Sequence, residues 1–123
     1  MSSFFEYEYW RVKPGKEEKC EQMIRDWFKY VASNQKTLFP EWKSARYFQQ
    51  TDRDGKATGL YIMLFEYHSI AEHHAYKERR KNWDGPYIEY KKFDPYHECF
   101  QLETVKTEYW QPLETDLWFE FSR

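Results

Sequence analysis

The run from Leu60 to Tyr67 is the most apolar stretch of an otherwise polar chain, and it constrains the fold more than any other feature. Side chains alternate between the two faces of a strand. One face of this strand would carry Leu60, Ile62 and Leu64, and the other would carry Tyr61, Met63 and Phe65. A strand that is apolar on both faces is central in its sheet and covered on both sides. The run therefore predicts a sheet packed between two layers.

Patterns on either side of this strand predict the remaining elements. Residues 69–72 (Ser-Ile-Ala-Glu) form a capping box, in which the Ser side chain accepts from the third amide of a helix. Residues 52–55 (Asp-Arg-Asp-Gly) predict a turn, extended by residues 56–59 into a hairpin loop. The expected elements are strands over 4–12, 42–51, 60–67 and 99–110, helices over about 16–34 and 70–81, a helical segment over 87–93, and a short terminal strand or arm over 117–121.

This order predicts an α+β, ferredoxin-like βαββαβ fold with an antiparallel sheet. Two helices cover only one face of such a sheet, so the other apolar face needs a second cover. A second copy of the same sheet supplies it by symmetry, which predicts a homodimer through the sheet face. We expect one domain over residues 1–123, with a core over about 4–110 and a C-terminal arm over 111–123 that reaches the partner.

Composition excludes several classes of protein. The net charge of −2 disfavours binding to nucleic acids or acidic membranes, which normally requires a basic surplus. No apolar run approaches the roughly 20 residues of a membrane span. Two cysteines without a CxxC motif provide no disulfide framework, so we expect a cytoplasmic protein. Because 22% of the residues are aromatic, the core must be built from rings.

Two stretches carry a family resemblance. An aromatic first strand leads into Val-Lys-Pro-Gly-Lys-Glu-Glu (12–18) and an amphipathic helix, and residues 65–78 join a strand to a helix through a short polar turn. With these stretches, residues 4–110 resemble the dimeric α+β-barrel superfamily, which includes antibiotic-biosynthesis-monooxygenase-like proteins and haem-degrading monooxygenases. The resemblance implies a dimer and a ligand cavity between helices and sheet. It implies no single reaction, because the fold hosts oxygenases, isomerases, cyclases and non-catalytic members.

Haem-degrading members carry an Asn late on the first strand and a Trp and a His on the second helix. The corresponding positions of this chain hold Glu8 and Tyr76, and Tyr87 is nearest to the position of the His. All three positions depart from that pattern, so no haem is expected.

Four residues are candidates for acid–base chemistry: Glu8, Glu66, His68 and Tyr76. Glu66 follows the most apolar stretch, where burial would raise the pKa of its carboxyl and make it a general base. The alternative for Glu66 is a place at the rim of the sheet, paired with Arg11 or Arg46. We expect the turn from Glu66 to His68 to face Glu8 and Tyr76.

A ligand pocket could be lined by aromatic and imidazole side chains, namely Tyr7, Trp10, Tyr67, His73, His74, Tyr76, Trp83 and Tyr87. Such aromatic stripes are also typical of an ordinary core. The basic run Lys77, Arg79, Arg80, Lys81 complements the helix dipole, or else anchors a ligand carboxylate or phosphate.

The histidines offer one candidate metal set, His74, Glu78 and His97. The motifs HxxxH and HExxH are absent, and the adjacent His73 and His74 would point about 100° apart on a helix. We therefore expect no metal and no tightly bound cofactor. Three functions stay open: a cofactor-independent oxygenase or isomerase for a small aromatic or apolar substrate, a non-catalytic binding or stress-type dimer, and a metal- or haem-binding member.

Overall fold

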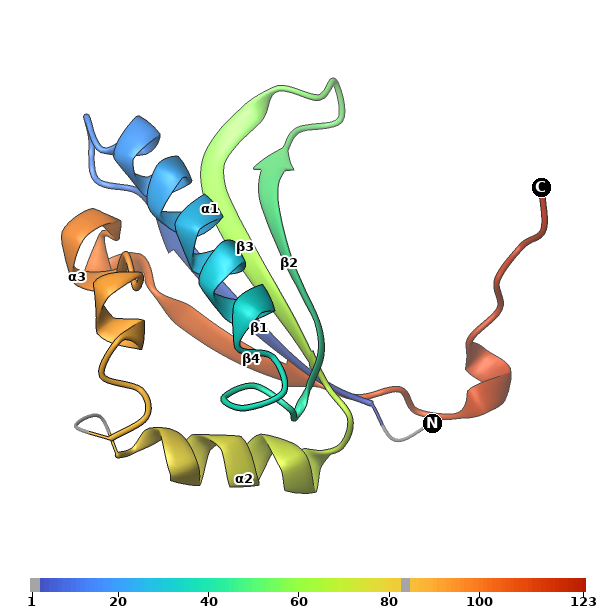
Figure 1. Cartoon of the computed structure of the whole chain (residues 1–123). Coiled ribbons are helices and arrows are strands. Elements are labelled where there is room, and N and C mark those ends of the chain that lie inside the picture. Colours follow the sequence, from blue (N-terminus) through green and yellow to red (C-terminus); the bar gives the residue numbers. More distant parts are fainter. Residues whose placement is uncertain (1–2, 83–84) are drawn as a thin grey trace.

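The computed structural model describes residues 3–82 and 85–123 (Figure 1). Trp83, one of the expected pocket residues, lies outside the described residues. The elements in chain order are β1 (Phe4–Arg11), α1 (Glu17–Ser33), β2 (Trp42–Thr51), β3 (Ala57–Tyr67), α2 (Ile70–Arg80), a 3₁₀ turn (Tyr90–Lys92), α3 (Tyr96–Cys99), a 3₁₀ turn (Leu102–Thr104), β4 (Lys106–Trp110) and a last 3₁₀ turn (Thr115–Leu117).

The four strands form one antiparallel sheet in the order β2-β3-β1-β4. The run that was expected to be central is central, because β3 pairs with β2 on one side and with β1 on the other. This topology confirms the predicted ferredoxin-like α+β fold. Among the described residues, no helix combines the length and the apolar character needed to cross a membrane.

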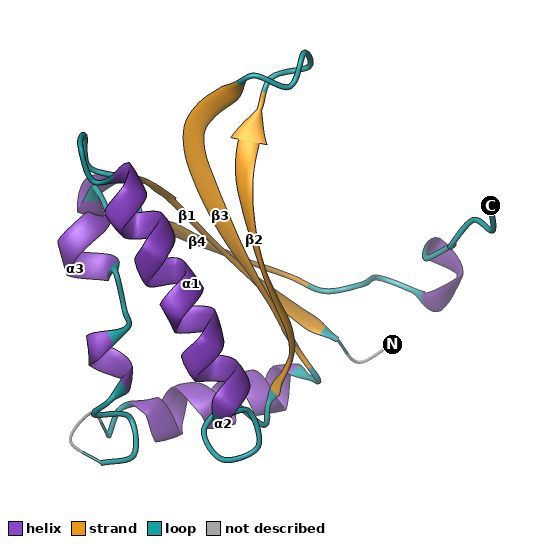
Figure 2. Ribbon diagram, turned by 45° about the horizontal axis from the view of Figure 1, so that its top comes forward, coloured by secondary structure: helices purple, strands orange, loops and turns teal. Residues whose placement is uncertain are grey.

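The two faces of the sheet have different surroundings. Figures 1 and 2 show α1, α2 and α3 on one side of the sheet; on the other side they show only the short helical turn of the C-terminal segment, which stands away from the strands. Strand alternation on β1 turns Glu6, Glu8 and Trp10 toward the helices and Phe5, Tyr7 and Tyr9 away from them. We call the side opposite α1, α2 and α3 the open sheet face; by strand register it comprises Phe5, Tyr7, Tyr9, Arg11, Ser44, Arg46, Phe48, Leu60, Ile62, Leu64, Glu66, Lys106, Glu108 and Trp110.

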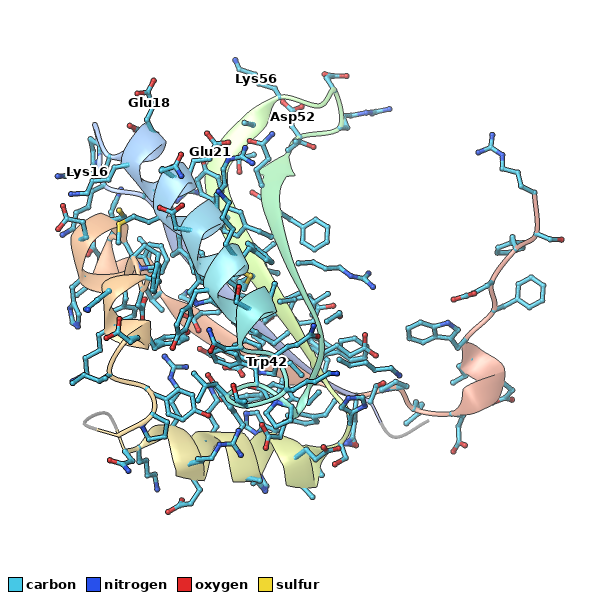
Figure 3. All side chains as sticks on the ribbon, in the orientation of Figure 1. Lys16, Glu18, Glu21, Trp42, Asp52 and Lys56 are labelled. Carbon is cyan, nitrogen blue, oxygen red and sulfur yellow. The ribbon has the colours of Figure 1, made fainter. Side chains whose placement is uncertain are left out.

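Aromatic rings fill the space between helices and sheet. Trp42 is at the centre of this core, and Figure 3 shows it near the C-terminal end of α1. Its indole contacts Trp27 of α1, Phe65 of β3 and Tyr76 of α2, at centroid distances of 5.7, 4.8 and 5.0 Å. The prediction of a core built from rings is therefore confirmed.

The second helix begins as its capping box predicts. The Oγ of Ser69 accepts a hydrogen bond from the Glu72 amide at 3.1 Å, which satisfies one of the amides that a helix start leaves without a partner. The helix ends at Arg80, one residue before the expected boundary.

The hairpin between β2 and β3 is tighter than predicted. Residues 57–59 belong to β3 and not to the loop. The reason is the side chain of Asp52, whose Oδ1 accepts from the amides of Asp54 and Lys56 at 2.9 and 3.0 Å and closes the turn early. Gly55 supplies the positive φ that this turn requires.

The prediction of a fourth strand over 99–110 is wrong in its first half. Cys99 ends α3 and is buried beside Met23, and Phe100 makes only an isolated bridge with Val12. The turn Leu102–Thr104 then interrupts the chain, so β4 contains only five residues. The expected helix over 87–93 is reduced to the turn Tyr90–Lys92, and residues 117–121 form no strand.

Candidate functional site

A cavity of about 650 Å³ lies between the sheet and the helices, within the usual size range of small-molecule sites. Its floor consists of β1 and β3, and its walls come from α1, α2 and the segment 90–100. Most of its lining is aromatic or apolar: Trp10, Ile24, Trp27, Trp42, Met63, Phe65, Tyr67, Tyr90, Pro95, Tyr96 and Phe100. Its charged and titratable members are Glu6, Glu8, Lys77, Arg80, Lys91, Asp94 and His97.

Two carboxylates stand side by side on the cavity floor because they are two residues apart on β1. Glu6 is buried and firmly bound. The Tyr67 hydroxyl donates to its Oε1 at 3.0 Å, and the Lys77 ammonium donates to its Oε2 at 3.1 Å. The nearby carboxylate and burial raise the pKa of the Tyr67 hydroxyl, so Tyr67 stays a proton donor to Glu6.

Glu8 differs from Glu6 in its contacts. Among residues 3–82 and 85–123, its carboxylate has no hydrogen-bond or salt-bridge partner, although it lines the cavity. Burial raises the pKa of Glu8, and the neighbouring charge of Glu6 raises it further. The cations of Lys77 and Arg80 act in the opposite direction on the same pKa. A desolvated carboxylate without a partner is suited to accept a proton from a ligand.

The polar wall opposite these carboxylates is formed by Lys77 and Arg80 of α2. These two residues share the inward side of the helix with His73 and Tyr76, because the four recur at spacings of three and four. Arg80 lies 3.8 Å from Asp94, and its guanidinium stacks over the Tyr90 ring at 4.4 Å. The cavity therefore presents cations on one wall and carboxylates on its floor.

His73 lies behind this wall. It is buried, its Nε2 is 3.7 Å from Glu6 Oε1, and neither ring nitrogen has a hydrogen-bond partner among the described residues. Burial lowers the pKa of His73, while Glu6 partly opposes this shift. His73 is thus favoured as a neutral ring next to an ionic group, and it does not itself line the cavity.

The structure does not bring the four acid–base candidates together. Glu66 lies on the open sheet face, opposite the cavity, where its carboxylate accepts from Ser3 and Ser44 and lies 3.6 Å from Lys43. His68 is exposed at the turn. The expectation that this turn faces Glu8 and Tyr76 is therefore wrong: an even-numbered residue of β3 points away from an even-numbered residue of β1.

The expected pocket residues divide into three groups. Trp10 and Tyr67 line the cavity. Tyr76 and Tyr87 are fully buried in the core instead, and the Tyr87 hydroxyl is bound to the Leu38 carbonyl and Arg79. Tyr7 is on the open sheet face and His74 is exposed, so neither contributes.

Several cavity residues were not among the site candidates taken from the sequence. Glu6 shares its strand face with Glu8, a spacing that could have revealed it, whereas Trp27, Tyr90 and Asp94 come from distant segments. Lys77 and Arg80 were named only as part of a basic run that could anchor a ligand. The set of His74, Glu78 and His97 forms no metal centre, and the described part of the chain contains no group of three His, Cys, Asp or Glu side chains that could hold a metal ion.

Comparison with known proteins gives relatives in structure only. No family model matches the sequence, and no curated protein matches it. A candidate antibiotic biosynthesis monooxygenase from Bordetella bronchiseptica superposes with a TM-score of 0.61 at 15% identity, covering 93% of this chain and all 100% of that one. A NIPSNAP family protein from Agrobacterium tumefaciens gives 0.60 at 17% identity, over 92% and 95% of the two chains.

A hydroxynitrile lyase from Passiflora edulis gives a TM-score of 0.58 at 18% identity, over 93% of this chain and 96% of that one. At such identities the likeness shows the fold alone. The chain has the ferredoxin-like α+β fold of these solved structures.

Proposed function

We propose that this protein binds a small aromatic molecule in the cavity and removes a proton from it without a cofactor. The observation that carries this proposal is the Glu8 carboxylate, which has a raised pKa and no partner among the described residues. It lies in a ring-lined cavity whose other wall carries Lys77 and Arg80. The proteins with this fold include, by their names, a candidate monooxygenase and a lyase, so the reaction must be argued from the site.

The proposed step uses each part of the site. The substrate ring packs against Trp10, Trp27 and Trp42, and Glu8 takes a proton from an acidic C–H or O–H bond. The electron pair stays on the substrate and collects on its oxygen as an enolate or phenolate, which the cations of α2 stabilise. Return of the proton from Glu8 to a different atom completes an isomerisation. Where the anion is instead captured by O₂, a C–O bond forms, Glu8 returns its proton to the peroxide, and loss of water from this hydroperoxide breaks the O–O bond and leaves a carbonyl group on the substrate, so that O₂ is the oxidant.

Ligand binding is expected to quench the intrinsic fluorescence, because three tryptophans line the cavity. Titration with 2-tetralone and phenylpyruvate, two aryl-substituted carbonyl compounds with acidic α C–H bonds, should give saturable quenching. Their α protons should exchange faster in D₂O with protein present, as followed by NMR. Saturable binding without faster proton exchange would favour the alternative function of a non-catalytic binding protein. If neither compound binds, the proposal of an aromatic ligand in this cavity is contradicted.

We also propose that two copies associate through the open sheet face. This face carries Phe5, Ile62 and Leu64 among other apolar side chains, and Figure 2 shows no helix over it. Light scattering at micromolar concentration should therefore give twice the chain mass of 15.4 kDa. A mass of one chain under these conditions would contradict the dimer.

A further inference from the structure

A second cavity, of about 530 Å³, lies between α1 and the hairpin of β2 and β3, on the helix side of the sheet. We call it the hairpin groove; its acidic and aromatic lining is Glu17, Glu18, Glu21, Phe28, Tyr47 and Tyr61. Within the described part of the chain, it shares only the Ile24 side chain with the cavity that contains Glu8. The hairpin groove is therefore a separate place for a ligand.

One side of the hairpin groove is a pair of stacked tyrosines. Tyr47 of β2 and Tyr61 of β3 are diagonal neighbours on the sheet, and their rings lie 5.6 Å apart at an angle of 5°. Both rings are only partly buried, and Phe28 of α1 lies across the groove from them. Burial raises the pKa of the Tyr47 hydroxyl, so this ring stays neutral. Neutral aromatic rings attract cations to their faces.

The other side of the hairpin groove carries carboxylates. Glu17 and Glu21 are four residues apart on α1 and lie on one side of the helix. Figure 3 shows Glu21 between α1 and the strands, and Glu18 at the N-terminal end of the helix. Glu21 is 3.0 Å from Arg25, whereas Glu17 and Glu18 have no cationic partner among residues 3–82 and 85–123.

The charges around the hairpin groove do not cancel. Its described lining contains three carboxylates and one guanidinium, that of Arg25. The nearest lysines in sequence, Lys16 and Lys19, instead bind Glu98 beside α3, at 3.4 and 2.6 Å. Cys20 adds no charge, because burial raises the pKa of its thiol to about 12. The hairpin groove thus combines a negative charge with aromatic side chains.

We propose that the hairpin groove binds a small alkylated ammonium ion. Its positive charge would lie near Glu17 and Glu18, and its alkyl groups would pack against Tyr47 and Tyr61. A neutral ring would leave the carboxylates unused, and the described residues contain no group of acidic side chains that could hold a metal ion. The proposal does not depend on the chemistry of Glu8.

Choline is the probe, and its neutral isostere 3,3-dimethyl-1-butanol is the matched ligand. The two molecules have nearly the same shape, but only choline carries a positive charge. Titration followed by NMR should show saturable shifts of the Tyr47 and Tyr61 ring signals with choline. The isostere should bind at least about tenfold more weakly, because it lacks both the cation–π and the carboxylate interaction.

Two variants test the two sides of the hairpin groove. Tyr61→Leu keeps an apolar side chain and removes the ring, and it should weaken choline binding at least about fivefold. Glu18→Gln removes one carboxylate and should weaken binding about threefold; Glu18 is exposed, so the variant should stay folded even if Tyr61→Leu does not. The control is Glu103→Gln, which removes an exposed carboxylate outside the groove and should leave binding unchanged.

Three results would overturn the proposal. Equal binding of choline and its isostere would show that the groove does not recognise the charge. If Glu8→Gln weakens choline binding and Glu18→Gln does not, choline lies in the other cavity. If choline does not bind at millimolar concentrations, Glu17 and Glu18 serve only the start of α1, where carboxylates favour the helix dipole. None of these results changes the fluorescence and exchange tests with aryl ketones.

Discussion

Arg79→Met is expected to lower the free energy of unfolding by about 3–5 kcal/mol, as when a buried ion pair loses one partner. The guanidinium of Arg79 holds both oxygens of Glu41 at 2.6 Å and the Leu38 carbonyl at 3.0 Å. Its Nε donates to the Tyr87 hydroxyl at 2.9 Å. The change leaves the buried Glu41 carboxylate without its counter-ion.

Chemical denaturation measures this loss, which is a large share of the 5–15 kcal/mol typical of a whole domain. The matched control is Lys81→Ala at the C-cap of the same helix, which removes an exposed pair with Glu78 at 2.9 Å and should cost about 0.5 kcal/mol or less. Glu41→Gln should cost less than Arg79→Met, because Arg79 is more exposed than Glu41 and can be hydrated. A loss of less than about 1 kcal/mol in the free energy of unfolding for Arg79→Met would contradict the structural role of the Arg79–Glu41 ion pair.

Glu8→Gln is expected to slow proton exchange on a bound aryl ketone by about 10²–10⁴-fold, the usual contribution of a general base. Gln keeps the size of the side chain and loses only the ability to accept a proton. The dissociation constant from fluorescence quenching should therefore stay within about threefold of the wild type. Glu66→Gln is the matched control: it removes a carboxylate from the opposite face of the same sheet and should leave exchange unchanged.

The pH dependence gives this prediction a second readout. Glu8 must be ionised to accept a proton, so exchange should fall as the pH is lowered through its pKa, which burial raises above 4.5. Because the folded state holds this proton more tightly than the unfolded state, the contribution of Glu8 to stability decreases as the pH rises through the same range. Glu8→Gln should thus be at least as stable as the wild type at neutral pH. A variant that loses activity only by unfolding would contradict the assigned role.

The fold could be predicted from the sequence because its signals are local. Strand alternation placed Glu6, Glu8 and Trp10 on one face of β1, and the two-sided apolar run placed β3 inside the sheet. The prediction of one strand over 99–110 was wrong because the first residues of this segment pack among the helices. Cys99 is the last residue of α3, and the chain joins the edge of the sheet only at Lys106.

The site was predicted only in part because it depends on which side of each element faces inward. Glu8, Trp10 and Tyr67, three of the candidates from the sequence, line the cavity. For the lysine and arginine of α2, the sequence left open whether they complement the helix dipole or anchor a ligand. His73, Tyr76, Lys77 and Arg80 form one stripe, and the burial of His73 and Tyr76 is what turns the two cations inward. Tyr90 and Asp94 also line the cavity, but they belong to a segment whose position no local sequence pattern predicts.

The short β4 has a consequence for how this protein avoids uncontrolled assembly. β4 pairs with β1 alone and is an edge strand, the kind of element that can add strand after strand into a growing fibre. Pairing through sheet faces closes after two copies, whereas pairing along an edge never closes. Lys106 and Glu108 put charges on this edge, and Pro112 stops it from lengthening, since proline cannot donate to the ladder. Pro112 thus ends the edge strand, which disfavours strand-by-strand polymerisation, and the chain after it continues as the C-terminal arm.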